Sequence, residues 1–188
     1  MKTRRYQMTA RAASAQDTAD RLIDAMLARF RTTSYPALRL DDVARDAGVT
    51  VQTAIRRYGT KDQLLAATAQ REVQRIAAAR EQPAFADPAT AVAALCEYYE
   101  RDGDLIARFE ADAVLVPALA DLARQGRAVH VRWIEEVFAT RLGDDRELRL
   151  AQLIAILDVR TWQVLRRERA LGPHNTRRAL EALVASVG

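Results

Sequence analysis

The sequence predicts an all-α protein, and three observations support this fold class. Glycine and proline are scarce, with 7 and 5 residues in a chain of 188, so few positions interrupt a helix. Apolar residues recur every three or four positions through most of the chain, which is the period of an amphipathic helix. No segment keeps the two-residue alternation of a half-buried strand. We expect about nine helices, divided between an N-terminal three-helix helix-turn-helix domain and a helical C-terminal domain.

Composition excludes several classes of protein. With 49% hydrophobic residues, the chain can bury a sizeable core. The single cysteine, Cys96, excludes an internal disulfide framework, and two histidines leave little material for a metal site. We therefore expect no metal and no cofactor. No apolar run approaches about 18 residues, and the N-terminus lacks the apolar core of a secretion signal. These features favour a cytoplasmic protein without a membrane span.

Charge is distributed unevenly along the chain. Residues 1–82 contain 15 Lys and Arg against 9 Asp and Glu, a net charge of +6, whereas residues 83–188 contain 14 against 16, a net charge of −2. The basic excess would attract phosphate groups and release their counterions. A solvated basic surface explains the same excess, and charge alone does not separate the two explanations.

The chain divides into four expected segments. Residues 1–13 form a basic flexible arm, which either enters a DNA minor groove or is a charged tail. Residues 14–60 form the helix-turn-helix domain, and Ser14 with Asp17 resembles an N-terminal cap for its first helix. Residues 61–82 form a connecting helix. Pro83 and Pro88 mark the start of the C-terminal domain, residues 83–188.

The most informative stretch is residues 39–61, which is typical of two short helices separated by a tight turn. Apolar residues recur at the helical period from Leu40 to Ala47, and Gly48 can adopt the left-handed conformation that ends a helix. Over residues 51–58, apolar and polar side chains divide between two sides of the next helix. The inward set is Ala54, Ile55 and Tyr58, and the outward set is Gln52, Thr53, Arg56 and Arg57. Such an outward surface suits the major groove of DNA.

Hydroxyl residues precede the second short helix of this region and the connecting helix. Thr50 and Thr60 are placed to cap the helices that follow them. Lys61 then stands at a helix N-terminus, where a phosphate meets both its ammonium group and free backbone amides. We therefore expect Lys61 to anchor the DNA backbone.

The C-terminal domain is expected to contain helices over residues 88–101, from residue 104, from residue 117, over residues 147–167 and from residue 173. Asp102 and Gly103 end the first of these, and Pro117 separates the next two. Residues 147–167 are apolar on more than one face, and such a helix needs two packing partners. We expect the last two helices to pair with those of a second subunit, as a four-helix bundle in a homodimer.

A larger set of N-terminal residues matches a known pattern in both type and spacing. It comprises Leu22, Ala25, Phe30, Tyr35, Asp42, Val43, Ala44, Ala47, Gly48, Val49, Thr50, Thr53, Arg56, Tyr58, Thr60, Lys61, Leu64 and Leu65. In these residues the chain resembles the tetracycline-repressor (TetR) family of bacterial transcription regulators. The resemblance is specific over roughly a quarter of the chain, and the rest agrees only in the number and order of helices.

The resemblance implies a ligand-responsive repressor that binds a palindromic double-stranded DNA operator as a dimer. It implies that the second helix of the helix-turn-helix enters the major groove, and that the C-terminal domain is a ligand-binding and dimerisation domain. A small-molecule effector bound there releases the DNA. The DNA-facing positions are then Arg39, Thr50, Val51, Gln52, Thr53, Arg56, Arg57 and Lys61.

Three residues depart from the family pattern. Ile55 stands where a phosphate-binding tyrosine is usual, Arg57 where tyrosine or histidine is common, and Arg39 where a capping threonine is usual. Loss of the cap costs about 1 kcal/mol, whereas the two arginines can meet phosphates with a full charge. We assign base reading to Gln52 and Arg56, because their side chains can bond bidentately to adenine and guanine edges. For Arg56, a phosphate contact is the alternative.

The effector site is expected among six aromatic or imidazole side chains, each of which is also explained as a core or interface residue. They are Tyr98, Tyr99, Phe109, His130, Trp133 and Trp162. Asp158 also needs an explanation, since a carboxylate in an apolar helix requires a partner. We expect a salt bridge with Arg160 or with an arginine across the dimer, and a cationic ligand is the alternative.

Two other functions fit parts of the sequence. A helical enzyme is disfavoured, because Cys96 has no histidine near it in the sequence and no glycine-rich phosphate loop occurs. We expect no catalytic residue. A non-specific architectural DNA-binding protein is disfavoured by the defined reading helix and the large second domain. Competition with unrelated DNA distinguishes it, because a specific regulator holds its site about 10³-fold more tightly.

Overall fold

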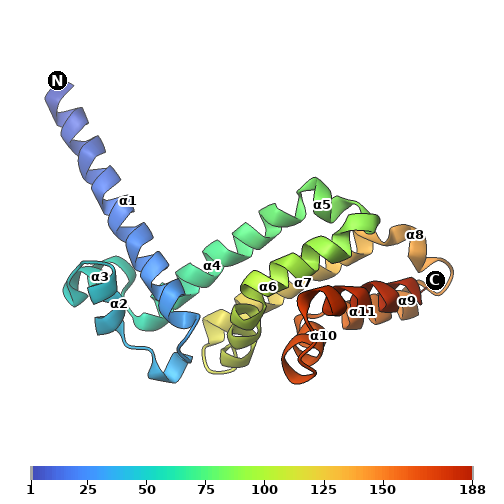
Figure 1. Ribbon diagram of the computed structural model, residues 1–188. Helices are drawn as coiled ribbons and strands as arrows, with labels where there is room; N and C mark the ends of the chain where they lie inside the picture. Colours follow the sequence, from blue (N-terminus) through green and yellow to red (C-terminus); the bar gives the residue numbers. More distant parts are fainter. Residues whose placement is uncertain (1, 188) are drawn as a thin grey trace. The chain divides into compact units, whose positions relative to one another are not determined.

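The computed structural model describes residues 2–187, and it places the side chains of residues 13–117 and 119–187. This part of the chain contains eleven α-helices, one 3-10 helix and one π-helix, and it contains no strand (Figure 1). The predicted all-α class is confirmed. The elements in order are α1 (Lys2–Phe30), η1 (Tyr35–Ala37), α2 (Leu40–Asp46), α3 (Val51–Tyr58), α4 (Lys61–Arg80), α5 (Pro83–Ala86), α6 (Pro88–Asp112), α7 (Pro117–Val137), α8 (Ala139–Leu142), α9 (Arg146–Ile156), α10 (Val159–Gln163), η2 (Val164–Glu168) and α11 (Pro173–Ala185).

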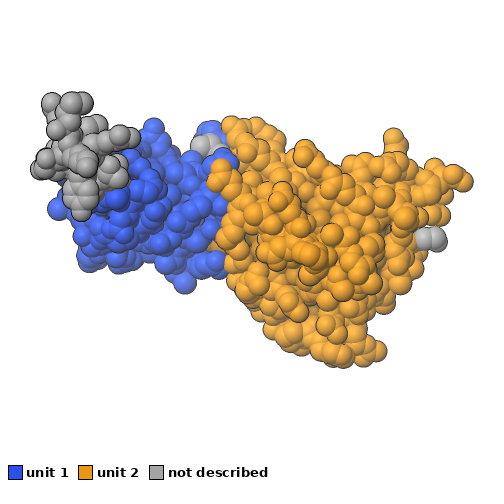
Figure 2. Space-filling view, turned by 90° about the horizontal axis from the view of Figure 1, so that it is seen from above, with its two compact units in different colours: residues 1–72, 112–120 blue, residues 73–111, 121–188 orange. Residues whose placement is uncertain are grey.

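The chain forms two compact units (Figure 2). Unit 1 contains residues 1–72 and 112–120, and unit 2 contains residues 73–111 and 121–188. The chain therefore passes from unit 1 to unit 2 within α4, and it returns to unit 1 around the connection between α6 and α7. Each of the four segments expected from the sequence is one continuous range, whereas unit 1 also contains residues 112–120. Their independence as domains stays a prediction.

The core of unit 1 forms where α1, α2 and α3 pack together. Leu22, Met26 and Phe30 are buried at successive turns of α1, and Val43 and Ala44 are buried on α2. These residues belong to the apolar stripes that the helical period predicted. The stripes therefore place the polar side of each helix toward solvent.

Helix α1 begins earlier than the sequence suggested. Ser14 lies inside it, and its carbonyl oxygen accepts a hydrogen bond from the Thr18 hydroxyl at 3.0 Å, one turn away. The predicted cap at Ser14 and Asp17 is therefore wrong. Asp17 instead accepts a hydrogen bond from Arg21 at 3.2 Å. The predicted basic arm falls on residues 1–13, of which the side chains of 1–12 lie outside the described residues, and its contact with DNA stays a prediction.

Helix α6 runs through the position where the sequence predicted a break, so the predicted helix end at Asp102 and Gly103 is wrong. Gly103 is buried, and a Cβ atom there would lie 2.6 Å from Cζ3 of Trp162. The glycine thus allows the indole ring to pack directly on the α6 backbone. Asp102 is also buried, and it accepts a hydrogen bond from Arg75 on α4 at 2.9 Å. Gly103 and Asp102 therefore make contacts inside unit 2 rather than ending a helix.

The segment predicted as one helix over residues 147–167 consists of α9, α10 and the π-helix η2. Asp158 causes the break between the first two, because its side chain caps α10 by accepting a hydrogen bond from the Arg160 backbone N–H at 2.8 Å. The same carboxylate pairs with Arg127 of α7 at 3.3 Å. Asp158 therefore forms a salt bridge as expected, but its partner is Arg127 rather than the Arg160 guanidinium group.

The core of unit 2 is one cluster of buried side chains contributed by α5 to α11. Trp133, Phe138 and Trp162 are among its largest members. Helices α9 and α11 lie side by side (Figure 1). The number of α-helices in the described residues exceeds the expected nine for two reasons: α5 and α8 are short helices that were not predicted, and Asp158 divides one predicted helix. In the opposite direction, α6 combines two predicted helices. No helix in the described part of the chain is long and apolar enough to span a membrane.

Candidate nucleic-acid interface and ligand pocket

The turn between α2 and α3 depends on one glycine and one arginine. Gly48 has a φ of +66°, in the left-handed region where a Cβ atom is penalised. Arg21 of α1 donates a hydrogen bond to the carbonyl oxygen of Ala47 at 2.8 Å. This bond satisfies one of the carbonyl groups that a helix end leaves without an internal partner. The predicted helix end at Gly48 is confirmed.

Helix α3 is held at both ends. Thr50 caps it by accepting a hydrogen bond from the Thr53 backbone N–H at 3.2 Å, as predicted. Ala54 is buried on its inner side. Near its C-terminal end, the Tyr58 hydroxyl donates to the carbonyl oxygen of Ala19 on α1 at 3.3 Å. These contacts fix which side of α3 faces solvent.

The outer side of α3 carries Gln52, Arg56 and Arg57, all of which are exposed. Gln52 and Arg56 are four residues apart, so they lie one above the other on the same helix face. No hydrogen bond or ion pair joins either of them to another described residue. The inward prediction for Ile55 is wrong: this side chain is 41% exposed, because Ala54 and Tyr58 already occupy the inner face.

Arg29 holds α1 against α2. Its guanidinium group forms two hydrogen bonds with Asp46 at 2.6 and 3.0 Å, and it lies 3.7 Å from Asp42. The hydrogen bond from Arg29 lowers the pKa of Asp46 below its usual value. The sequence pattern did not indicate this pair, because 17 positions separate the two residues. The pair fixes α2, the helix that precedes α3.

Helix α4 begins with a reciprocal capping box. The Thr60 hydroxyl accepts from the Gln63 backbone N–H at 3.2 Å, and the Gln63 side chain accepts from the Thr60 backbone N–H at 3.0 Å. Gly59 precedes this box with a φ of +78°. The predicted cap at Thr60 is confirmed, and Gln63 completes it.

Lys61 is already engaged inside unit 1. Its ammonium group donates to the carbonyl oxygens of Tyr35 and Leu38 at 3.0 and 3.1 Å, and it lies 4.0 Å from the centroid of the Tyr35 ring. The Tyr35 hydroxyl is hydrogen-bonded to Asp62, which raises the pKa of Tyr35 to about 12. An ammonium group has three N–H donors, and these two carbonyl groups occupy two of them. Through these hydrogen bonds, Lys61 attaches the loop that contains η1 to the start of α4.

Arg39 precedes α2 without capping it. It makes no side-chain cap hydrogen bond, and its guanidinium group lies 3.8 Å from Asp41 with 73% of the side chain exposed. Its charge is therefore available at the surface. All eight predicted DNA-facing residues belong to unit 1: Arg39, Thr50, Val51, Gln52, Thr53, Arg56, Arg57 and Lys61.

Most of the aromatic residues predicted for a ligand site are core residues of unit 2. Tyr98, Tyr99 and Trp162 are buried, and their rings form a series with centroids 5.8 and 6.0 Å apart. The Tyr99 hydroxyl donates to the Leu157 carbonyl oxygen at 2.9 Å, and the Trp162 indole N–H donates to Glu100 at 3.1 Å. Phe109 is partly buried on α6.

A second aromatic group surrounds Arg80 at the end of α4. The guanidinium carbon lies 4.4 Å from the ring centroid of Trp133, 4.6 Å from that of Phe85 and 5.2 Å from that of Tyr98. Nη2 of Arg80 lies 3.4 Å from Nδ1 of His130. We call Arg80, Phe85, Tyr98, His130 and Trp133 the arginine cage. The sequence did not single out Arg80, because burial of an arginine leaves no local pattern.

The hydrogen bonds of His130 define its protonation. Its Nε2 atom lies 3.1 Å from the carbonyl oxygen of Leu157. A carbonyl oxygen only accepts, so Nε2 carries the proton and Nδ1 accepts from Arg80. Burial, and next the charge of Arg80, lower the pKa of His130 to about 4. The imidazole is therefore neutral at pH 7, and it stacks on Trp133 with ring centroids 5.5 Å apart.

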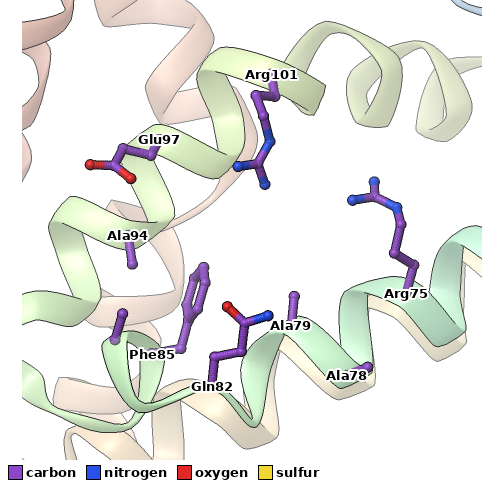
Figure 3. A pocket seen from close by; sticks show the side chains of 9 residues that line it. Arg75, Ala78, Ala79, Gln82, Phe85, Ala94, Glu97 and Arg101 are labelled. Atoms are coloured by element: carbon purple, nitrogen blue, oxygen red, sulfur yellow. The ribbon is translucent and has the colours of Figure 1, made fainter.

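A pocket of about 420 Å³ lies between α4, α5 and α6, and it shares Phe85 with the arginine cage (Figure 3). Figure 3 shows the guanidinium groups of Arg75 on α4 and Arg101 on α6 directed into the space between the two helices. The remaining lining residues are Ala78, Ala79, Gln82, Ala84, Ala94 and Glu97. None of the six residues predicted for the ligand site lines this pocket. The sequence did not indicate this pocket, because alanines in a helix also suit an ordinary helix surface.

The family model described as bacterial regulatory proteins, tetR family, matches residues 22–68 of this chain. These residues extend from α1 through the turn at Gly48 and into α4. The match confirms the family resemblance of the helix-turn-helix region. No curated protein matches the sequence at a significant level.

Solved structures share the fold over most of the chain. A transcriptional regulator from Rhodococcus sp. Rha1 has a TM-score of 0.75 at 22% identity, covering 90% of this chain and 95% of its own. A TetR transcription regulator from Haloarcula marismortui has a TM-score of 0.69 at 19% identity, covering 92% and 98%. The multidrug binding protein EbrR, complexed with proflavin, has a TM-score of 0.58 at 23% identity, covering 88% and 99%. At these identities the likeness establishes the fold alone.

Proposed function

Through its helix-turn-helix region the chain belongs to the TetR family of bacterial transcriptional regulators, and from this premise we propose that it is a ligand-responsive repressor. It binds a palindromic operator in the cytoplasm as a dimer, and it leaves the operator when a small molecule binds unit 2. The observation that carries the proposal is the outer side of α3, where Gln52 and Arg56 share one exposed face.

Helix α3 has the chemistry of a recognition helix. Gln52 can form two hydrogen bonds with an adenine edge, and Arg56 can form two with a guanine edge. The exposed Ile55 is suited to contact a thymine methyl group. Arg57 and Arg39 carry exposed charge that can meet phosphates, which positions the helix without reading sequence.

Arg56→Ala is expected to weaken operator binding by about 1–3 kcal/mol and to relax the base preference at one operator position. Lys61→Ala is expected to weaken binding to all sequences alike. It should also lower the stability of unit 1, because it removes two hydrogen bonds to the η1 loop. Genomic-fragment selection with the wild-type protein identifies the operator. Titration of each variant against singly substituted operators at fixed salt then measures both effects.

Arg124→Gln is the matched control for these variants. Arg124 is an exposed arginine of unit 2 that pairs with Asp121, so its loss should leave operator binding unchanged. A loss of affinity that is uniform over all substituted operators for Arg56→Ala would contradict base reading by Arg56 and would assign this residue to a phosphate.

We assign dimerisation to the outer side of α9 and α11. Leu148, Ala151, Gln152 and Ala155 are exposed at helical spacing on α9, and Leu148 is 61% exposed. On the neighbouring α11, Leu183 is 41% exposed. Exposed leucines interspersed with alanines suit close packing against a second helix pair. A four-helix bundle of two copies buries them.

The double variant Leu148→Glu with Leu183→Glu is expected to convert a dimer into a monomer at micromolar concentration. Two carboxylates buried without partners would cost about 3 kcal/mol or more, which raises the dimer Kd by roughly 100-fold or more. Analytical ultracentrifugation measures the change. Val114→Glu is the control, because Val114 is 83% exposed in unit 1. A wild-type monomer, or a dimeric double variant, would exclude this interface.

The effector part of the proposal follows from binding thermodynamics. A ligand releases DNA only if it binds the DNA-free state more tightly, because equal affinity for both states shifts nothing. EbrR, which has this fold, is complexed with proflavin in its structure, and this supports a small-molecule ligand for this chain. The predicted aromatic residues and the arginine cage are the groups available to bind it.

A further inference from the structure

We propose that the arginine cage binds the anionic group of an organic acid, and that this acid is the effector of the repressor. The binding site follows from the environment of Arg80, whereas the regulatory role rests on the proposed function. The physical basis is a buried positive charge without a counterion.

The fold removes the charge of Arg80 from water. The residue is 9% exposed, and no carboxylate in the described part of the chain forms an ion pair with it. Its Nε and Nη1 atoms have no hydrogen-bond partner within the same part of the chain. Arginine cannot lose its proton under ordinary conditions, so the charge remains. An unpaired buried charge is among the costliest arrangements in a protein.

The neighbours of Arg80 offset only part of this cost. The rings of Phe85, Tyr98 and Trp133 stabilise a cation through their π-faces. His130 accepts one hydrogen bond but is neutral, so it brings no negative charge. The N–H groups of Nε and Nη1 therefore remain without an acceptor among the described residues. A carboxylate supplies the missing negative charge, and its oxygens accept strong hydrogen bonds from guanidinium N–H groups.

The neighbouring pocket gives the apolar part of an acid a place to bind. Its volume of about 420 Å³ falls within the range of small-molecule sites, and four alanines line it together with Phe85 (Figure 3). The Phe85 backbone is anchored, because its carbonyl oxygen accepts from the Trp133 indole N–H at 2.7 Å. Its side chain belongs to both the pocket and the cage.

The pocket lining contains charged groups of both signs. Arg75 and Arg101 line it together with the carboxylate of Glu97, and Arg75 is paired with Asp102 at 2.9 Å. The preference for an anion therefore comes from Arg80. The ligand class is an amphipathic carboxylate with an aromatic or aliphatic body.

Matched pairs of probes test the ligand class with the full-length protein. Indole-3-acetic acid, 1-naphthoic acid and decanoic acid are each compared with their primary amide by isothermal titration calorimetry. We expect at least one acid to bind ten-fold or more tightly than its amide. Arg80→Met should abolish this preference, and Arg80→Lys, which keeps the charge without the planar fork, should reduce it. Arg124→Gln should retain it.

Two results would overturn the proposal: no acid binds more tightly than its amide, or Arg80→Met keeps the wild-type preference. Thermal unfolding without a probe compares the Tm of Arg80→Met with that of the wild type. If Arg80 serves only to stabilise the fold, the variant has a lower Tm. If Arg80 is an unpaired charge, the variant has an unchanged or higher Tm. Should Arg80→Met fail to fold, a wild-type preference in Arg80→Lys overturns the proposal.

Operator binding separates this proposal from the proposed function. Wild-type protein without sequence-specific DNA binding would refute the repressor, whatever the acids do. Acids that bind through Arg80 but leave operator affinity unchanged would support the binding site and refute the effector role. Operator release by an acid in the wild type, and its loss in Arg80→Lys or Arg80→Met, would support both.

Discussion

Replacing Gly103 by alanine is expected to lower the free energy of unfolding by about 2 kcal/mol, although alanine is the better helix former. A Cβ atom at this position would lie 2.6 to 2.9 Å from three ring atoms of Trp162. The indole is completely buried, and its N–H donates to Glu100 at 3.1 Å, so the ring has little freedom to withdraw. Overpacking therefore outweighs the gain in helix propensity. Denaturant unfolding of both proteins measures the difference.

Gly126→Ala is the matched control, since Gly126 also lies inside a helix of unit 2. A Cβ atom at this position would have Cγ2 of Val73 as its nearest neighbour at 3.9 Å, an ordinary contact, so this change should stabilise the protein by about 0.5–1 kcal/mol. Trp162→Phe removes the outer part of the indole, and Gly103→Ala should cost less in that background. An equal cost in both backgrounds would show that Trp162 is not the cause.

Stability is expected to fall by up to about 3 kcal/mol between pH 6.5 and pH 4 because of His130. Burial and then Arg80 lower its pKa from 6.5 to about 4, with a smaller contribution from Arg127, while the Leu157 carbonyl group and Asp158 act in the opposite direction. As the pH falls below 6.5, the unfolded chain binds a proton that the folded chain does not bind until about pH 4. The unfolded state therefore gains stability throughout this window.

His130→Gln isolates this effect. Its amide group can donate to the Leu157 carbonyl oxygen and accept from Arg80, as the neutral imidazole does, but it does not titrate. Between pH 7 and pH 4.5, the variant should lose about 2 kcal/mol less stability than the wild type, as measured by urea unfolding. His174→Gln controls for the loss of an exposed histidine. Equal losses in wild type and His130→Gln would contradict the prediction.

Features with a local cause could be predicted from the sequence. Gly48 ends α2, Thr50 caps α3 and Thr60 caps α4, because a positive φ angle and a cap involve residues within one turn of each other. The division of α3 into an inner and an outer side follows from the helical period in the same way. Ile55 is the exception, since Ala54 and Tyr58 already fill the inner face.

Features that depend on residues far apart in the chain could not be predicted. Glycine is common at helix ends, yet Gly103 lies inside α6, where the Trp162 ring packs against it. The ammonium group of Lys61, expected to be free for a phosphate, already binds the carbonyl groups of Tyr35 and Leu38. Asp158 caps a helix and pairs with Arg127. Each partner lies outside the window in which sequence periodicity carries information.

The candidate ligand site shows the same limit. Tyr99 and Trp162 were reasonable predictions, because aromatic side chains are common in ligand sites, but their polar ends are used within the core. Arg80, by contrast, occupies an ordinary position in an alanine-rich helix. Only the packing of α5, α6 and α7 around it reveals a buried charge.

By itself, the sequence determined the helical class, the two short helices on either side of Gly48 and, except for Ile55, the side chains that face outward from α3, because helical period, caps and turns are encoded by near neighbours. The tertiary structure alone decided that Gly103 gives space to the Trp162 ring, which N–H donors of Lys61 are occupied, and that Arg80 is buried. The physical reason is that burial and pairing depend on contacts between distant segments, and these exist only once the chain has folded.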